Sequence, residues 1–161
     1  MKPIVIVPTY NEAENIRLLV AELLALSMPI DVVVVDDNSP DGTGRWCDEQ
    51  GEKNPRLLCL HREGKQGLGT AIIAGMKHAI QHGYRYVLNL DGDFSHPPAR
   101  IPALLAGMDP AEGPAVDVMI GSRYVKGGGI EGWPLRRHLM SRGVNCYARW
   151  LLGLVPRDCS G

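Results

Sequence analysis

Short apolar runs alternate along the chain with longer stretches in which apolar residues recur at helical spacing. The apolar runs show no polar alternation, which is typical of strands that are buried on both faces of a parallel sheet. They predict strands at residues 2–7, 30–35, 57–61, 86–90 and 116–120. The helical spacing predicts helices that begin near residues 11, 43, 68 and 97, and a last helix at 135–152. Because strands and helices alternate, we expect an α/β fold with a mostly parallel sheet flanked by helices.

The turn between the first strand and the first helix reads PTYNEAEN, at residues 8–15. We expect Asn11 to cap the helix, and Glu12 and Glu14 to lie in its first turn, where acidic side chains favour the helix dipole. A dinucleotide-binding domain would carry a Gly-x-Gly-x-x-Gly fingerprint at this position. The sequence therefore argues against an ordinary Rossmann dehydrogenase.

With 161 residues, the chain is long enough for one domain with a substantial core. Its 17 Lys and Arg residues against 18 Asp and Glu residues give a net charge of -1, which implies no bulk attraction to nucleic acid. The cysteines are widely spaced and are interpreted as free, buried thiols of a reducing cytosol. No apolar stretch approaches the ~20 residues of a membrane span, and the N-terminus does not resemble a signal peptide. These features predict a soluble, cytoplasmic domain without a transmembrane segment.

Asp91-Gly92-Asp93 directly follows the apolar run at 86–90. Open α/β sheets bind ligands at the carboxyl ends of their strands, which is where these carboxylates are expected to lie. Two converging carboxylates repel each other unless a divalent cation holds them, and their oxygens suit Mg²⁺ or Mn²⁺ shared with substrate phosphates. A solvated acidic turn is the alternative for this motif taken alone.

Other charged residues follow the remaining predicted strands. Asp36 and Asp37 could accept hydrogen bonds from a base or a ribose, although ordinary turn chemistry explains this stretch equally well. Lys65 lies in a glycine-rich basic loop without P-loop spacing, and Arg123 follows the run at 116–120, where a guanidinium could bind phosphate oxygens. Acids that hold a metal, together with cations that hold phosphate, indicate a nucleotide-diphosphate site that stabilises a departing diphosphate.

The predicted last helix at 135–152 has an apolar side and a basic side. The basic positions recur at i, i+4, i+7 and i+11; they are His138, Arg142, Asn145 and Arg149. Such a helix could lie on an anionic membrane surface or flank a diphosphate, and a solvated basic face is the commoner explanation. The loop at 126–134 contains three consecutive glycines and is a candidate lid or a plain linker.

Six segments carry a specific resemblance: PTYNEAENI, VDDNSPDGTG, REGKQGLGTA, LDGDFSHPP, GSRYVKGGG and WPLRRHLMSRGVN. In this order they resemble the motif series of the dolichol-phosphate mannosyltransferases, which are polyprenyl-phosphate mannose synthases in family 2 of the inverting glycosyltransferases. The resemblance covers nearly the whole chain, from Pro8 to Gly161. It implies a GT-A fold, a GDP-mannose donor, a divalent metal, and a polyprenyl or dolichyl phosphate acceptor at the cytoplasmic face of a membrane.

The resemblance also implies roles for individual residues. The implied nucleotide-sugar contacts are Pro8, Tyr10, Glu12, Val35, Asp37, Lys65, Asp91, Gly92, Asp93, Arg123 and Arg137. Within this set, Val35 and Asp37 would line the base and ribose pocket. Arg123 and Arg137 would hold the phosphates, with Arg136 as a close competitor for Arg137.

The implied catalytic residues are Asp91, Asp93 and Arg123, and the implied metal ligands are Asp91, Asp93 and Ser95. Some relatives carry Gln where this chain has Ser95, whose shorter hydroxyl could bind the metal through water.

Members of this family continue well past Cys159-Ser160-Gly161, so we expect a catalytic domain at 1–161 that is truncated at its C-terminus. Three alternatives to the mannosyltransferase remain open. The chain could be a non-catalytic fragment that binds a sugar nucleotide, or a transferase for another donor such as UDP-glucose. A sugar nucleotidyltransferase is a weaker alternative, because those enzymes usually carry a glycine-rich loop after the first strand.

Overall fold

The computed structural model describes residues 2–110, 114–125, 128–130, 132–156 and 158–159. The chain divides into two compact units, Met1–Pro102 and Ala103–Gly161.

The first unit contains a parallel sheet. The described residues form four strands in the order β3-β2-β1-β4, and every neighbouring pair is parallel. The strands are β1 (Ile4–Thr9), β2 (Asp31–Asp36), β3 (Leu57–His61) and β4 (Val87–Asn89). The helices are α1 (Ala13–Leu24), α2 (Thr43–Gly51) and α3 (Leu68–Gln81). The predicted parallel α/β sheet flanked by helices is therefore confirmed.

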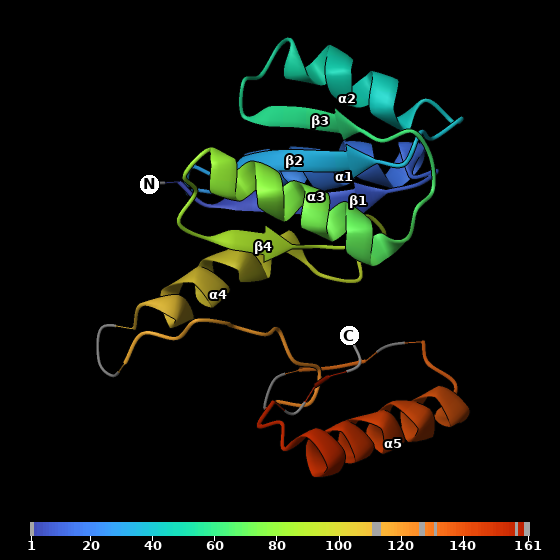
Figure 1. The fold of residues 1–161 in the computed structure, drawn as a ribbon, viewed down its shortest axis with the longest axis vertical. Coiled ribbons are helices and arrows are strands. Elements are labelled where there is room, and N and C mark those ends of the chain that lie inside the picture. Colours follow the sequence, from blue (N-terminus) through green and yellow to red (C-terminus); the bar gives the residue numbers. More distant parts are fainter. Residues whose placement is uncertain (1, 111–113, 126–127, 131, 157, 160–161) are drawn as a thin grey trace. The chain divides into compact units, whose positions relative to one another are not determined.

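Apolar side chains on both faces of β1 and β2 form the core of this unit. On one face Ile6 and Val33, which are paired in register, pack with Ala71 and Ala79 of α3. Helix α1 lies on the opposite face of the sheet (Figure 1), and it buries the apolar side that helical spacing predicted. Both central strands are thus covered on both faces, which explains their continuous apolar sequences.

One strand prediction is wrong about burial, and a second strand does not form. The run at 86–90 was expected to be a buried strand, but β4 pairs only with β1 in the sheet that the described residues form, and Val87 and Asn89 are exposed. Residues 116–120 were expected to form a fifth strand, but they form an irregular, exposed segment. A strand requires a partner as well as an apolar sequence, and pairing is not encoded in the run itself.

The start of α1 also differs from the prediction. Asn11 has a left-handed backbone, with φ of 61°, and Glu12 occupies the N-cap position. Groups from the loop after β2 and from the first residue of α2 accept hydrogen bonds from the first amides instead: Glu12 N donates to Thr43 Oγ1 at 3.1 Å, and Ala13 N donates to Asp41 Oδ2 at 2.9 Å. The helix start therefore depends on a segment that is distant in the sequence, and a local capping rule does not identify it.

Helix α4 (Ile101–Met108) follows a short 3-10 turn, Pro98–Arg100, and α5 (Leu135–Leu152) has the predicted bounds. The predicted apolar side of α5 is exposed; Leu139 and Trp150 are 63% and 82% accessible. The C-terminal segment lies against α5, where Cys159 N donates a hydrogen bond to Asn145 Oδ1. Within the described ranges, no helix combines the length and apolar character that crossing a bilayer requires.

Candidate functional site

The loops that carry the predicted site residues of the first unit lie at one edge of the sheet. Backbone hydrogen bonds continue past the strand ends, from Asp37 N to Thr9 O, from Arg62 N to Asp36 O and from Leu90 N to Ile6 O, each 2.9–3.0 Å long. The four strands are parallel, so the segments after β1, β2, β3 and β4 all emerge at this carboxyl edge. The topology therefore brings Asp36, Asp37 and Asp91 to the same edge, as the alternation of strands and helices predicts.

Asp36 organises the first two loops. Its buried carboxylate accepts hydrogen bonds from Thr9 Oγ1 at 3.1 Å and from Ser39 N at 3.0 Å. Ser39 Oγ in turn accepts a hydrogen bond from Asn11 N at 2.9 Å. Asp36 and Ser39 therefore hold the loop that follows β1.

Asp37 forms a buried ion pair with Arg62, with 3.0 Å between Asp37 Oδ1 and the guanidinium. The side chains of Asp37 and Arg62 are only 7% and 10% accessible, so both charges are largely removed from water. Gln66 N also donates a hydrogen bond to Asp37 Oδ2 at 3.4 Å. The sequence did not identify Arg62 as a site residue. The available signal was its position, because Arg62 directly follows β3, and β3 pairs with β2, the strand before Asp37.

Val35 and Pro8 are completely covered by the fold. Val35 belongs to the apolar cluster beneath α3, and Pro8 is buried in β1. Their side chains therefore serve the core and are not available to contact a nucleotide.

Tyr10 and Lys65 meet at the exposed surface of the same edge. The Lys65 ammonium lies 4.5 Å from the centroid of the Tyr10 ring, a favourable cation–π distance. Tyr10 comes from the loop after β1 and Lys65 from the loop after β3, so the contact joins the two loops. An accessible aromatic ring beside a cation is suited to a planar base or an anionic group.

The Asp-Gly-Asp segment contacts the turn after β1. A Cβ atom on Gly92 would lie 3.3 Å from Glu12 Cγ and 3.6 Å from Thr9 Cγ2, so glycine allows close approach here. Asp93 Oδ1 accepts a hydrogen bond from Ser95 N at 2.9 Å. Hydrogen bonds from the Ser95 side chain and backbone hold the pKa of Asp93 below its ordinary value, so the carboxylate is ionised at neutral pH.

The residues of this segment suit a hard divalent cation. Asp91, Asp93 and Ser95 offer only oxygen ligands, and all three side chains are partly or fully exposed. Asp91 Oδ2 lies 3.9 Å from His96 Nδ1, a buried atom without a hydrogen-bond partner in the described part of the chain. Mg²⁺ and Mn²⁺ favour such an oxygen set and take further ligands from water and substrate phosphates.

In the second unit, Arg123 is paired with Asp158. The guanidinium donates to Asp158 Oδ1 at 2.6 Å and to Oδ2 at 2.8 Å, and Arg123 N donates to Oδ2 at 3.0 Å. The hydrogen bonds from Arg123 to Asp158 raise the pKa of the guanidinium. Arg123 was predicted at the end of a strand; it lies instead in an irregular segment and is oriented by a carboxylate 35 residues later.

Trp133 brings Arg123 together with Arg137. The guanidinium carbons of Arg123 and Arg137 lie 4.9 Å and 4.1 Å from the centroid of the Trp133 ring. The pairing of Arg123 and Arg137 favours Arg137 over Arg136 as the second phosphate-binding candidate. Of the candidate lid at 126–134, Lys126, Gly127 and Glu131 lie outside the described residues.

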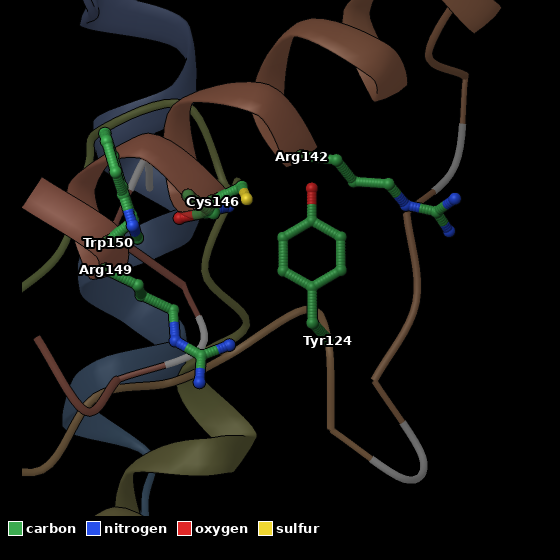
Figure 2. A pocket seen from close by; sticks show the side chains of 6 residues that line it. Tyr124, Arg142, Cys146, Arg149 and Trp150 are labelled. Carbon is green, nitrogen blue, oxygen red and sulfur yellow. The ribbon is translucent and has the colours of Figure 1, made fainter.

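The second unit also contains a cavity of about 420 Å³ along α5. Its lining residues are Tyr124, Arg142, Asn145, Cys146, Arg149 and Trp150. In the view of Figure 2 the Tyr124 ring lies between the side chains of Arg142 and Arg149. Three positions of the predicted basic side, two of them arginines, thus share one concave surface with aromatic rings, an arrangement suited to an anionic group.

The carboxyl edge of the parallel sheet thus combines an Asp-Gly-Asp motif with cation-bearing loops, and PTYNEAEN lies where a dinucleotide-binding domain would carry its fingerprint. The sequence profile described as glycosyl transferase family 2 matches residues 4–157, and the chain belongs to this family.

Two curated relatives are each 42% identical over 158 residues, or 98% of this chain. One is the polyprenol monophosphomannose synthase of Mycolicibacterium smegmatis, and the other is the undecaprenyl-phosphate mannosyltransferase of Micrococcus luteus. The chain spans 58% and 63% of their respective lengths. The predicted resemblance to polyprenyl-phosphate mannose synthases is confirmed.

Among solved structures, the mannosyltransferase PcManGT from Pyrobaculum calidifontis, in complex with GDP-Man and Mn²⁺, is similar with a TM-score of 0.50. It is 30% identical, and the match covers 57% of this chain and 27% of that chain. This likeness agrees with the GT-A fold predicted for the parallel sheet and its flanking helices.

Proposed function

We propose that this chain is the nucleotide-sugar-binding part of a mannosyltransferase that transfers mannose from GDP-mannose to a polyprenyl phosphate with inversion. The observation that carries this proposal is the close approach of Gly92, at the centre of Asp-Gly-Asp, to the turn after β1, where a Cβ atom on this glycine would lie 3.3 Å from Glu12 Cγ. It joins the proposed metal-binding segment to the proposed nucleotide-binding loops. The names of the relatives and the GDP-Man complex of the solved mannosyltransferase support the same donor and acceptor.

In this proposal the loops after β1, β2 and β3 bind the nucleoside. The exposed Tyr10 ring with the adjacent Lys65 ammonium provides a surface for the base or for a phosphate. A carboxylate has about four lone-pair sites, so Asp37 can accept a ribose hydroxyl while it stays paired with Arg62. Pro8 and Val35 contribute through their main chains.

The remaining candidate residues would serve the diphosphate. Asp91, Asp93 and Ser95 would hold a divalent cation, Mg²⁺ or Mn²⁺, which supplies positive charge for the departing diphosphate. Arg123 and Arg137, which flank Trp133, would bind the remaining phosphate oxygens through their guanidinium donors. A polyprenyl phosphate is a lipid, so we also propose that the protein acts at a membrane surface, on its cytoplasmic side.

The acceptor chemistry leads to a prediction about His96. The second pKa of a phosphomonoester is near ~6, so the acceptor is largely dianionic at neutral pH and attacks the sugar without losing a proton to the protein. We therefore expect His96→Ala to retain most of the transfer rate, although His96 lies beside Asp91. The measurement is mannose transfer to a polyprenyl phosphate, with this chain or with a longer protein that contains it.

A protein base would behave differently in the same assay, because loss of general-base catalysis costs about 10²–10⁴-fold in rate. A loss of that size in His96→Ala, with donor binding intact, would contradict the dianion argument. The pH profile provides a second check, since transfer should rise as the lipid phosphate ionises.

The donor can be tested separately by thermal shift with GDP-mannose, UDP-glucose and UDP-N-acetylglucosamine, each with and without Mn²⁺. We expect GDP-mannose with Mn²⁺ to stabilise the protein most; a ligand at 100 times its Kd contributes about 2.7 kcal/mol. Stronger stabilisation by a UDP-sugar would contradict the proposed donor. A different outcome would favour the alternative of a binding fragment: GDP-mannose binds in a metal-dependent manner, but no protein that contains this chain transfers mannose.

A further inference from the structure

A second group of potential metal ligands lies between α2 and β3, outside the proposed donor site. Cys59 and His61 are two residues apart on β3, so their side chains lie on the same face of that strand. Asp48 is one turn after Gly44 on α2, the helix that packs against β3. Figure 1 shows α2 beside β3, which is an edge strand of the described sheet. The topology thus aligns these three side chains on one helix–strand contact.

The geometry of this group is already close to that of a metal site. One ligand atom from each of Asp48, Cys59 and His61 lies within 4.8 Å of the others, and His61 Nε2 is 2.9 Å from Asp48 Oδ1. A Cβ atom on Gly44 would lie 3.0 Å from His61 Cε1 and 3.1 Å from Nδ1, so glycine leaves room for the imidazole against the helix. The ring is therefore held with Nε2 directed toward Asp48.

We propose that Asp48, Cys59 and His61 form a Zn²⁺ site that joins α2 to β3, with water as the fourth ligand. Zn–ligand bonds of about 2.0–2.3 Å in tetrahedral geometry place ligand atoms roughly 3.3–3.7 Å apart, so small side-chain rotations suffice. Sulfur, nitrogen and one carboxylate oxygen are a borderline-soft set that suits Zn²⁺ and disfavours Mg²⁺ and Mn²⁺. A thiolate and a carboxylate also balance the charge of the cation.

Cys47 supports this assignment from within the core. It is fully buried on α2, and its side chain is hydrogen-bonded to the Cys59 side chain. A bound metal displaces the thiol proton, and the Cys47 S–H can then donate to the resulting thiolate, as outer partners of metal ligands commonly do.

An ordinary surface ion pair explains only part of this arrangement. Asp48 and His61 are about half exposed, and exposed pairs of this kind contribute little to stability. The ion pair does not account for the Cys59 sulfur within reach of both groups. The site is also separate from Asp91 and Asp93 in its chemistry, so it does not depend on the proposed transfer reaction.

The test is a titration of the reduced protein with Co²⁺, followed by displacement with Zn²⁺. Tetrahedral Co²⁺ bound by a thiolate gives a near-ultraviolet charge-transfer band and visible d–d bands, which an oxygen-only site at Asp91 and Asp93 does not give. We expect one equivalent of Co²⁺ to produce both features and one equivalent of Zn²⁺ to abolish them. Zn²⁺ should also raise the Tm, because it binds the folded protein.

The variants are Cys59→Ser, His61→Gln and Asp48→Asn, with Cys146→Ser as the matched control on the exposed surface of α5. Cys59→Ser should remove the charge-transfer band, and His61→Gln and Asp48→Asn should weaken Co²⁺ binding by at least about tenfold. Cys146→Ser should bind as the parent does. His61 and Asp48 are exposed, so their variants test the proposal even if Cys59→Ser folds poorly.

Three outcomes would overturn the proposal. The first is the absence of a thiolate–Co²⁺ band in the parent protein. The second is a band that persists unchanged in Cys59→Ser. The third is a band that Cys59→Ser removes but that His61→Gln and Asp48→Asn leave at parental affinity, which would show a lone thiol in place of a three-ligand site.

Discussion

Replacing Asp93 with Asn is expected to weaken metal-dependent binding of GDP-mannose by roughly 100-fold or more, since even outer partners of metal ligands change metal affinity about 10–100-fold. The substitution is selective because Asn retains an oxygen that can accept the hydrogen bond from Ser95 N, which is 2.9 Å long in the parent. The turn is preserved and only the negative charge is lost. Asp93→Ala should show the same loss of metal dependence, and it also removes the hydrogen bond to the turn.

The measurement is isothermal titration of GDP-mannose with and without Mn²⁺. Glu22→Gln, which neutralises an exposed acid on α1, is the matched control and should bind as the parent does. The low pKa of Asp93 helps the comparison, because the parental carboxylate stays ionised until the pH falls below its ordinary value of 3.8. Equal metal dependence in Asp93→Asn and the parent would show that Asp93 does not hold the cation.

Much of the secondary structure could be predicted because its signals are local. The third strand and the last helix have the predicted bounds, since apolar runs and helical spacing are properties of the segment itself. The edge position of Asp37, Asp91 and Asp93 also follows from the sequence, because alternating strands and helices imply parallel strands with a common carboxyl edge.

The errors concern partners that are distant in the sequence. The apolar run at 116–120 has the composition of a strand, but composition does not supply the neighbouring strand with which it must pair. The expected Asn11 cap failed similarly, because Thr43 and Asp41 accept the hydrogen bonds of the first amides of α1. In both places a tertiary contact outweighs a local preference.

The same reason explains which site residues were missed or misplaced. Arg62 was not identified because its role depends on Asp37, which is buried beside it at the sheet edge. Val35 was expected to line the base pocket, but continuous burial of β2 places its side chain in the core. Cys59 and His61 share one face of β3, and Asp48 lies on α2. Neither pattern indicates a site by itself, because the three residues come together only when α2 packs on β3.

Arg123→Ala is expected to destabilise the second unit strongly, by about 3–5 kcal/mol, because it removes the guanidinium that donates two hydrogen bonds to the buried Asp158 carboxylate. The Asp158 side chain is only 2% accessible, and Arg123 supplies two side-chain hydrogen bonds and one backbone hydrogen bond to it. Asp158 lies beside Cys159, whose amide bonds Asn145 of α5, so the loss should spread to that helix. Hydrogen exchange of the α5 amides measures this local effect, with Arg136→Ala, an exposed arginine of the same helix, as the control.

Asp158→Asn separates the structural role of Arg123 from its proposed contact with phosphate. This variant keeps the guanidinium but removes the charge that orients it, so it should also increase α5 exchange, by less than Arg123→Ala. The two variants are compared under conditions in which their α5 amides are equally protected from exchange, for example at a lower temperature. If Arg123 binds the donor phosphates directly, Arg123→Ala should then lose more GDP-mannose affinity than Asp158→Asn. Unchanged α5 exchange in Arg123→Ala would contradict the structural role. Equal losses of donor affinity in the two variants would instead show that Arg123 acts only by holding the C-terminal segment against α5.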